Sequence, residues 1–142
     1  MRTYTPGIVK AATTQYATDI VGFNVDEWLD TPVNVALVNS AGDVALFEHR
    51  PELPQTVYGH YFFFSRGKEA IAAAEEFLQE IFQREYYVNT ITGLTPVENK
   101  GAVWMNKRLG FVEQGCVETE AGPCILVSLT KQEWITRMTK HG

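Results

Sequence analysis

The sequence has few of the features that mark membrane, nucleic-acid-binding or exported proteins. No apolar run reaches membrane-spanning length, and residues 1–6 carry no apolar signal core. The formal net charge is −5 without any basic excess, which argues against broad binding to nucleic acid or anionic membranes. We therefore expect a cytoplasmic protein with no nucleic-acid or membrane partner.

The usual signatures of metal sites and nucleophilic catalysis are also missing. The 3 histidines and 2 cysteines show no metal-ligand spacing, so we expect no metal. Neither a Gly-x-Ser-x-Gly elbow nor a Gly-x-x-x-x-Gly-Lys-Ser/Thr phosphate loop is present. Cys116 and Cys124 lie in segments expected to form facing strands. A disulfide between them is geometrically conceivable, but two free thiols are favoured because nothing indicates export.

What the sequence does contain is the composition of an ordinary globular domain. Hydrophobic residues make up 45% of the chain and charged residues 20%, a balance unlike that of disordered proteins. A length of 142 residues is enough to bury one core. Because no linker, repeat or low-complexity tract divides it, we expect a single domain over residues 1–142.

The residue pattern predicts a strand-rich order of elements with helices between them. Residues 33–38 and 43–47 flank a turn-forming segment and predict an antiparallel hairpin. Residues 56–64 predict a central strand, because aromatic side chains make both of its faces apolar. Residues 67–83 place apolar side chains at intervals of three and four, which predicts an amphipathic helix with Ser65 as its N-cap.

The remaining segments predict shorter elements. Residues 8–29 indicate one or two short helices, and residues 86–92 are typical of a strand. Thr95–Glu98 has the form of a capping box, so the next helix begins either there or at Asn99. The chain then ends in a second hairpin and a short helix capped by a threonine, over residues 112–119, 124–129 and 130–138.

The segment from Asn99 to Phe111 is the most informative motif. It predicts an amphipathic helix that Gly110 ends in the left-handed conformation. The spacing resembles the last helix of the GCN5-related N-acetyltransferases, the GNAT superfamily, whose pattern is roughly Asn-x-x-Ala-hydrophobic-x-hydrophobic-Tyr-x-Lys-x-Gly-Phe. In place of the family's tyrosine the chain has Asn106. It fits the pattern at Asn99, Ala102, Val103, Met105, Leu109, Gly110 and Phe111.

The order of elements over residues 33–130 is also similar to the GNAT order. This resemblance implies an α/β (α+β) fold with a single mixed, mostly antiparallel sheet, a splayed parallel pair of strands and flanking helices. It implies that acetyl-CoA is the cosubstrate and enters between the splayed strands. Tyr61–Ser65 would then face the pantetheine arm, with Tyr87–Thr92 as the splayed partner. Small proteins of tailed bacteriophages look similar in having this last helix without the tyrosine.

A helix start that could hold the diphosphate of acetyl-CoA can be sought in the sequence, because free N–H groups there bind anions. The family's usual form is Arg or Gln, two residues, Gly, one residue, then Gly or Ala. The chain does not fit this form, whether Ala70 is taken as the final small residue or Gly67 as the central glycine. A capped helix start with two solvated basic residues therefore stays open as the alternative. The positions that the resemblance assigns to acetyl-CoA are Phe62, Phe63, Phe64, Ser65, Arg66, Gly67, Lys68, Asn99 and Asn106.

Acetyl transfer to an amine needs a base for the ammonium proton and an acid for the leaving thiolate. Glu48, His49 and His60 are the candidate bases. For Glu48 the alternative is a solvated acid, and for His60 it is a packed, hydrogen-bonded histidine. Asn106 is a further candidate catalytic residue. Its amide cannot act as an acid, but it could hydrogen-bond the sulfur or the carbonyl of acetyl-CoA. Several tyrosines could replace the missing acid: Tyr58, Tyr61, Tyr86 or Tyr87.

Two functions follow from these observations. The first is an acetyl-CoA-dependent N-acetyltransferase that acts on a small-molecule amine or a protein amino group. The second is a catalytically inactive GNAT-like protein with a binding or structural role, of the bacteriophage kind. A homodimer is compatible with either function.

Overall fold

The computed structural model describes residues 2–15, 25–85, 88–120 and 122–141. Helices and strands follow one another as the sequence predicts, and their bounds are these: α1 (Pro6–Gln15), α2 (Val25–Asp30), β1 (Val35–Val38), β2 (Val44–His49), β3 (Thr56–Phe62), α3 (Lys68–Arg84), β4 (Thr90–Pro96), α4 (Lys100–Leu109), β5 (Val112–Thr119), β6 (Gly122–Thr130) and α5 (Lys131–His141).

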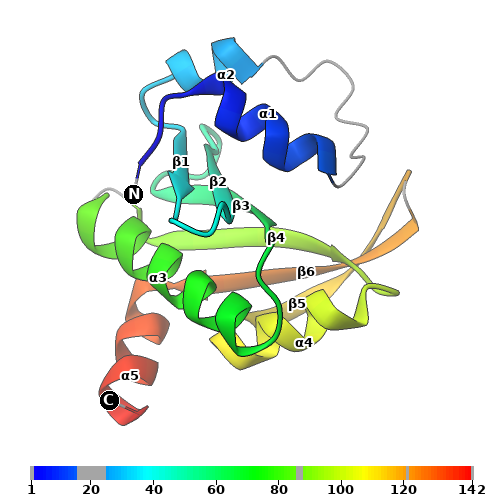
Figure 1. The fold of residues 1–142 in the computed structure, drawn as a ribbon. Coiled ribbons are helices and arrows are strands. Elements are labelled where there is room, and N and C mark those ends of the chain that lie inside the picture. Colours follow the sequence, from blue (N-terminus) through cyan, green and yellow to red (C-terminus); the bar gives the residue numbers. More distant parts are fainter. Residues whose placement is uncertain (1, 16–24, 86–87, 121, 142) are drawn as a thin grey trace.

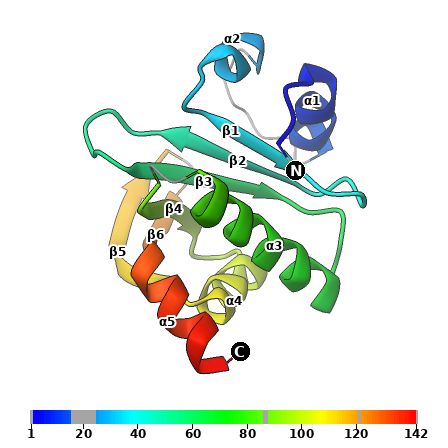
Figure 2. The same cartoon turned by 90° about the vertical axis from the view of Figure 1, so that its left-hand side faces the viewer.

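One sheet organises the chain. Its six strands lie in the order β1-β2-β3-β4-β6-β5, and every neighbouring pair is antiparallel except β3 and β4. Helices α1 and α2 lie on one side of this sheet, and α3, α4 and α5 lie on the other (Figures 1 and 2). The expected mixed, mostly antiparallel sheet with one parallel pair and flanking helices is confirmed.

The sheet separates two hydrophobic clusters because successive side chains of a strand point to opposite faces. The larger cluster lies between the sheet and α3, and includes Phe47, Val57 and Phe77. The smaller one lies under α1 and α2 and includes Trp28 and Phe62. The central strand β3 therefore contributes side chains to both clusters, as its two apolar faces predict.

Helix α4 begins and ends as the motif in its sequence indicates. The Asn99 side chain accepts a 3.1 Å hydrogen bond from the N–H of Ala102, so Asn99 is its N-cap. Gly110 has φ 91° and ψ 11°, the left-handed conformation that glycine adopts without steric cost. A capping box also opens α5: Thr130 Oγ1 accepts the Glu133 N–H at 3.1 Å, and a Glu133 carboxylate oxygen accepts the Thr130 N–H at 2.9 Å.

Two predicted caps are wrong. Ser65 does not cap α3, since Gly67 is the N-cap and the Ser65 hydroxyl donates to Asp43 instead. Thr95 and Pro96 do not open a helix, because β4 continues through both residues in register with β6. In each case a long-range partner replaced the local one that the motif suggests.

Some expectations for the remaining segments can be compared with the structure. The predicted short helices at residues 8–29 are α1 and α2, while residues 16–24 lie outside the described part of the chain. Tyr86 and Tyr87 of the predicted strand 86–92 are also outside it. Among the described residues, no helix combines the length and the apolar character that crossing a membrane needs.

The two cysteines are free thiols, as favoured by the sequence. Cys116 is exposed and Cys124 is buried. In the β5–β6 register, Cys124 pairs with Val117 and Cys116 pairs with Ile125. Because adjacent residues of a strand point to opposite faces, the two sulfur atoms lie on opposite sides of the hairpin.

Candidate active site

A cavity of about 820 Å³ passes through the sheet where β3 and β4 diverge. These parallel strands pair only from Thr56↔Thr90 to Tyr58↔Thr92, whereas β4 continues beside β6 as far as Pro96. Beyond the last pair, the Tyr58 hydroxyl accepts the N–H of Leu94 at 3.0 Å. The opening exists because, beyond Tyr58, the backbone of β3 pairs only with β2 and the backbone of β4 pairs only with β6.

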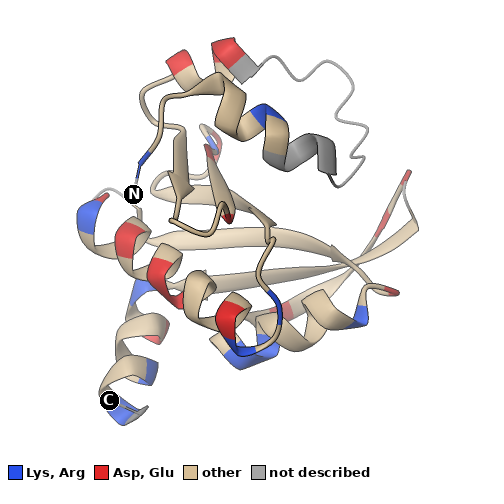
Figure 3. Ribbon diagram, viewed as in Figure 1, with Lys and Arg blue, Asp and Glu red and all other residues tan. Residues whose placement is uncertain are grey.

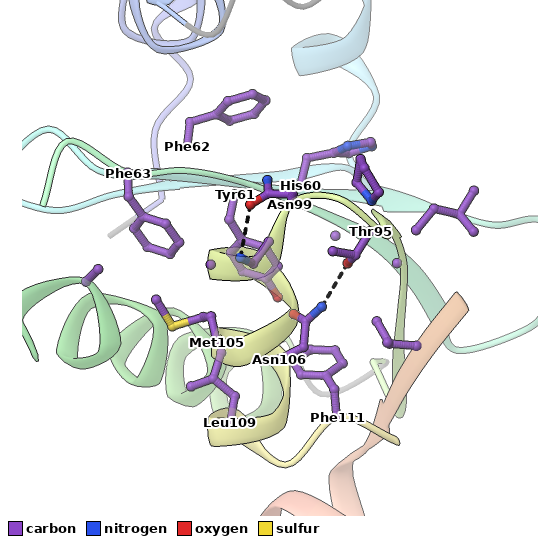
Figure 4. A pocket seen from close by; sticks show the side chains of 18 of the residues that line it. His60, Tyr61, Phe62, Phe63, Thr95, Asn99, Met105, Asn106, Leu109 and Phe111 are labelled. Carbon is purple, nitrogen blue, oxygen red and sulfur yellow. Dashed lines mark hydrogen bonds between the residues drawn. The ribbon is translucent and has the colours of Figure 1, made fainter. Parts of the chain in front are cut away.

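The predicted site residues come together around this cavity, from segments far apart in the sequence. Phe64 and Lys68 are the two predicted residues that do not line it. Figure 4 shows the labelled side chains, with Phe62 and Phe63 on opposite sides of β3. The predicted residues that line it are Glu48, His60, Phe62, Phe63, Ser65, Arg66, Gly67, Asn99 and Asn106.

The start of α3 borders the cavity on the side where α4 lies. Gly67 is its N-cap, with φ 57° and ψ −128°, and no side chain caps the helix. A Cβ built on Gly67 meets no atom within 4 Å, so the backbone is open to an approaching ligand. Arg66 and Lys68 beside it are exposed. Figure 3 shows the basic residues at this helix start and acidic residues further along α3. The N–H of Glu69 already bonds the carbonyl oxygen of Arg66 at 3.2 Å. The other N–H groups of the first turn, a glycine and two cations suit an anion such as a diphosphate.

A buried carboxylate fixes the loop that leads into α3. Asp43 accepts the N–H of Phe64 at 2.7 Å, the N–H of Ser65 at 2.9 Å and the Ser65 hydroxyl at 2.7 Å. Asn39 donates a further hydrogen bond to it at 3.0 Å. Burial raises the pKa of the Asp43 carboxyl, but these hydrogen bonds lower it by more, so the pKa lies below its ordinary value. Asp43 is therefore an ionised anchor for residues 64 and 65.

Asn106 connects α4 to β4 at the edge of the cavity. Its side-chain amide donates a 2.8 Å hydrogen bond to Oγ1 of Thr95, a residue that is buried (Figure 4). Asn99 lines the same side, and its side-chain oxygen is engaged in capping α4. Both asparagines thus hold α4 in place, and both present polar atoms at the cavity wall.

His60 and Glu48 line the opposite side of the sheet, which α2 partly covers. They share this side with Trp28, Leu46 and Phe62, which also line the cavity. The His60 ring packs on Tyr58 with 4.7 Å between ring centroids. Burial lowers the pKa of His60 to about 4, with a smaller contribution from the positive charge of Arg50. His60 is therefore neutral near pH 7, and the same burial makes it a weaker base than a solvated histidine.

Solved structures of acetyltransferases have a similar fold. A mutant form of the spermidine/spermine N-acetyltransferase SpeG from Vibrio cholerae matches with a TM-score of 0.75 and 12% sequence identity, over 97% of this chain and 96% of that one. The ribosomal-protein-S5-alanine acetyltransferase from Vibrio fischeri matches with a TM-score of 0.61 and 15% identity, over 76% and 67%. A GNAT-family acetyltransferase from Bacillus anthracis matches with a TM-score of 0.57 and 15% sequence identity, over 76% of this chain and 71% of that one. No protein-family model and no curated protein sequence matches the chain.

The chain has the GNAT fold. The diverging pair β3 and β4 is the splayed pair that the resemblance implied, and the cavity between them opens toward both faces of the sheet. The strand facing the cofactor was expected at Tyr61–Ser65, but β3 ends at Phe62. Its splayed partner was expected at Tyr87–Thr92, and β4 instead runs from Thr90 to Pro96.

Sequence reasoning missed several residues that line this cavity or position its walls. Asp43 gave no signal, because its partners Phe64 and Ser65 lie 21 and 22 positions away. Thr95 was assigned to a cap, although its alternation with Gly93 in a strand would have placed it at the cavity. Trp28 came from the least regular part of the sequence, and only its large apolar surface pointed to burial.

Proposed function

We propose that this chain is an acetyl-CoA-dependent N-acetyltransferase acting on an amine. The observation that carries the proposal is the cavity itself, which joins an uncapped helix start on one side of the sheet to two proton acceptors on the other. The similar solved structures support it, since they include a spermidine/spermine N-acetyltransferase and a ribosomal-protein-S5-alanine acetyltransferase. The acceptor would be a small-molecule amine or a protein amino group. The enzyme would be a single domain and cytoplasmic.

Acetyl-CoA would lie on the α3 and α4 side. The first N–H groups of α3, with Arg66 and Lys68, would hold its diphosphate, and the open backbone at Gly67 leaves room for it. Phe62–Ser65 would run along the pantetheine arm, beside Asn99 and Asn106 from α4. Glu69 in the first turn would oppose a diphosphate, but its side chain is exposed and therefore well screened by solvent.

The amine would enter from the α2 side and meet Glu48 and His60. Among the described residues that line the cavity, these two are the side chains able to take a proton from an ammonium group. His60 is already neutral at pH 7, and Glu48 lies on the neighbouring strand β2. Transfer would form a bond between the amine nitrogen and the acetyl carbon, break the carbon–sulfur bond, and leave the electron pair on sulfur.

A binding or structural role is the second candidate, and a specific observation favours it. The side-chain amide of Asn106 stands where the family pattern has a tyrosine, and it is engaged with Thr95. A chain of this kind, like the small bacteriophage proteins that share the motif, would form a stoichiometric complex with another protein and would not turn over acetyl-CoA.

The test of the proposal is acetylation of a panel of amines. The panel would contain polyamines, aminoglycosides, amino acids and peptides with free N-termini, with acetylated product measured by mass spectrometry. We expect at least one amine to be acetylated in proportion to enzyme and time. The variants Glu48→Gln and His60→Gln should each reduce this rate while binding acetyl-CoA normally. Tight acetyl-CoA binding without product from any amine would favour the second candidate.

A further inference from the structure

The hydroxyl of Tyr61 is buried and forms no hydrogen bond with the described residues, while the Tyr61 side chain lines the cavity. A buried hydroxyl without a partner destabilises a fold, so it calls for an explanation beyond packing. Neither the helix-start site nor the two proton acceptors uses this group.

The ring of Tyr61 is held in one orientation by aromatic neighbours. Phe47 meets it edge to face at 5.8 Å between centroids, and Phe63 stacks on it at 6.1 Å with an interplanar angle of 6°. These contacts belong to the cluster between the sheet and α3. Figure 4 shows Tyr61 on the same side of β3 as Asn106 and Met105, which is the side proposed for acetyl-CoA.

The hydroxyl lies where β3 and β4 diverge. A Cβ built on Gly59 would come within 3.2 Å of the Tyr61 hydroxyl and 3.2 Å of Cγ2 of Ile91. The oxygen therefore occupies space beside the bare backbone of Gly59, one position beyond the last β3–β4 pair at Tyr58. Gly93 faces this point from β4, where a Cβ would lie 3.7 Å from the Gly59 carbonyl oxygen. The two glycines leave the phenol at the narrow end of the opening.

We propose that Tyr61 is a catalytic residue that donates a hydrogen bond to the carbonyl oxygen of the acetyl thioester. This inference rests on the proposed acetyltransferase function. When the amine nitrogen bonds to the acetyl carbon, the carbonyl oxygen gains negative charge. The O–H of the phenol is a hydrogen-bond donor already in place for that oxygen. The proton stays on Tyr61 throughout, while the ammonium proton goes to Glu48 or His60.

The surroundings of Tyr61 suit a donor and not an acid. Burial raises the pKa of the Tyr61 hydroxyl above its ordinary value, so the phenol is protonated near neutral pH. A thiolate would not take a proton from such a group. Hydrogen bonds to developing charge are strongest where water is excluded, and the Tyr61 oxygen is itself buried. Tyr61 would thus provide stabilisation that Asn106, engaged with Thr95, does not.

The variant Tyr61→Phe tests the proposal, with Tyr4→Phe as the control. Both variants remove one phenol oxygen, but Tyr4 is exposed and outside the cavity. Titration calorimetry would compare acetyl-CoA with S-ethyl-CoA, which lacks the carbonyl oxygen. We expect Tyr61→Phe to weaken the binding of acetyl-CoA by about 3- to 10-fold and to leave the affinity for S-ethyl-CoA unchanged. On an amine that the wild type acetylates, kcat should fall by about 100-fold.

The outcomes separate this proposal from the function on which it rests. Tyr61→Phe should melt at or above the wild-type temperature, because an unpaired hydroxyl is removed. Equal affinity changes for both CoA compounds, or no change for either, would overturn the role of Tyr61 and leave the acetyltransferase proposal standing. Failure of the wild type to bind either compound would overturn the proposed function, and the role of Tyr61 with it.

Discussion

Asp43 and Ser65 are joined by two hydrogen bonds: the carboxylate accepts the Ser65 N–H at 2.9 Å and its hydroxyl at 2.7 Å. This contact ties the turn between β1 and β2 to the loop before α3. The helix start at Gly67 follows only two residues later. The proposed diphosphate site is therefore positioned by a carboxylate from another hairpin, and not by a cap within the helix.

Replacing Asp43 should both destabilise the fold and loosen this site. We expect Asp43→Asn to lower the free energy of unfolding by about 2 kcal/mol, since hydrogen bonds to a buried charge are lost. Urea unfolding measures this change, and acetyl-CoA affinity should fall in parallel. Glu120→Gln, at an exposed position between β5 and β6, is the charge-matched control. A stable Asp43→Asn protein with normal affinity would show that the anchor is unnecessary.

The stability of the protein should fall in acid partly through His60. Its pKa is lowered from 6.5 to about 4, so the folded state resists protonation that the unfolded chain accepts. The contribution is present above pH 6.5 and is lost as the pH falls toward 4. The difference in unfolding free energy between wild type and His60→Gln should therefore shrink across this interval. A difference that is constant, or that grows in acid, would contradict a neutral His60.

Protonation of Asp43 should lower the stability of the protein further, at a lower pH than protonation of His60. Its pKa lies below the ordinary value of 3.8, so its contribution is complete above that value and disappears as the pH falls through the lower folded value. Wild type should lose stability below pH 4 more steeply than Asp43→Asn does. Unfolding curves at pH 2.5 to 5 would measure the two slopes, and equal slopes would mean that the carboxylate is not held by Ser65.

The hydrogen bond between Asn106 and Thr95 should couple α4 to β4. In a double-mutant cycle, Asn106→Ala and Thr95→Val should each destabilise the protein, with a coupling energy of about 1 kcal/mol. Chemical denaturation of the four proteins gives this energy. Additive effects of the two substitutions would mean that the contact contributes nothing to the position of α4.

Gly67 allows a test of the diphosphate site in which strain and charge are separated. Its φ of 57° strains any substituted side chain, although no atom lies within 4 Å of a built Cβ. Gly67→Ala introduces the strain alone, and Gly67→Glu adds a carboxylate beside the phosphates. We expect the glutamate variant to bind acetyl-CoA at least tenfold more weakly than the alanine variant, about 1.4 kcal/mol or more. Equal affinities for the two variants would place the diphosphate elsewhere.

Local patterns in the sequence predicted most of the fold. The periodicity of residues 67–83 and the Gly110 stop depend on contacts within a few residues, and the structure confirms both. The caps assigned to Ser65 and Thr95 were wrong because a distant group competes for each side chain. Asp43 accepts the hydrogen bond of the Ser65 hydroxyl, and the pairing of β4 with β6 makes Thr95 part of a strand.

The candidate site was predictable where the fold determines it and obscure elsewhere. Asn99, Asn106 and Gly67 follow from one motif and one helix start. The hydroxyl of Tyr61 could not be assigned, since its position depends on the divergence of β3 from β4 and on the missing side chain of Gly59. Alternation along β3 does predict that Tyr61 and Phe62 face opposite sides, but not which side receives acetyl-CoA.

Titration of the wild-type protein with acetyl-CoA tests the proposed site most directly. Desulfo-CoA and ATP serve as comparisons, because the first keeps the diphosphate and most of the arm while the second lacks the arm. We expect micromolar binding of acetyl-CoA, slightly weaker binding of desulfo-CoA, and none of ATP at the same concentrations. The absence of heat and of any thermal shift at millimolar acetyl-CoA would contradict a diphosphate site at the start of α3, and with it the acetyltransferase function.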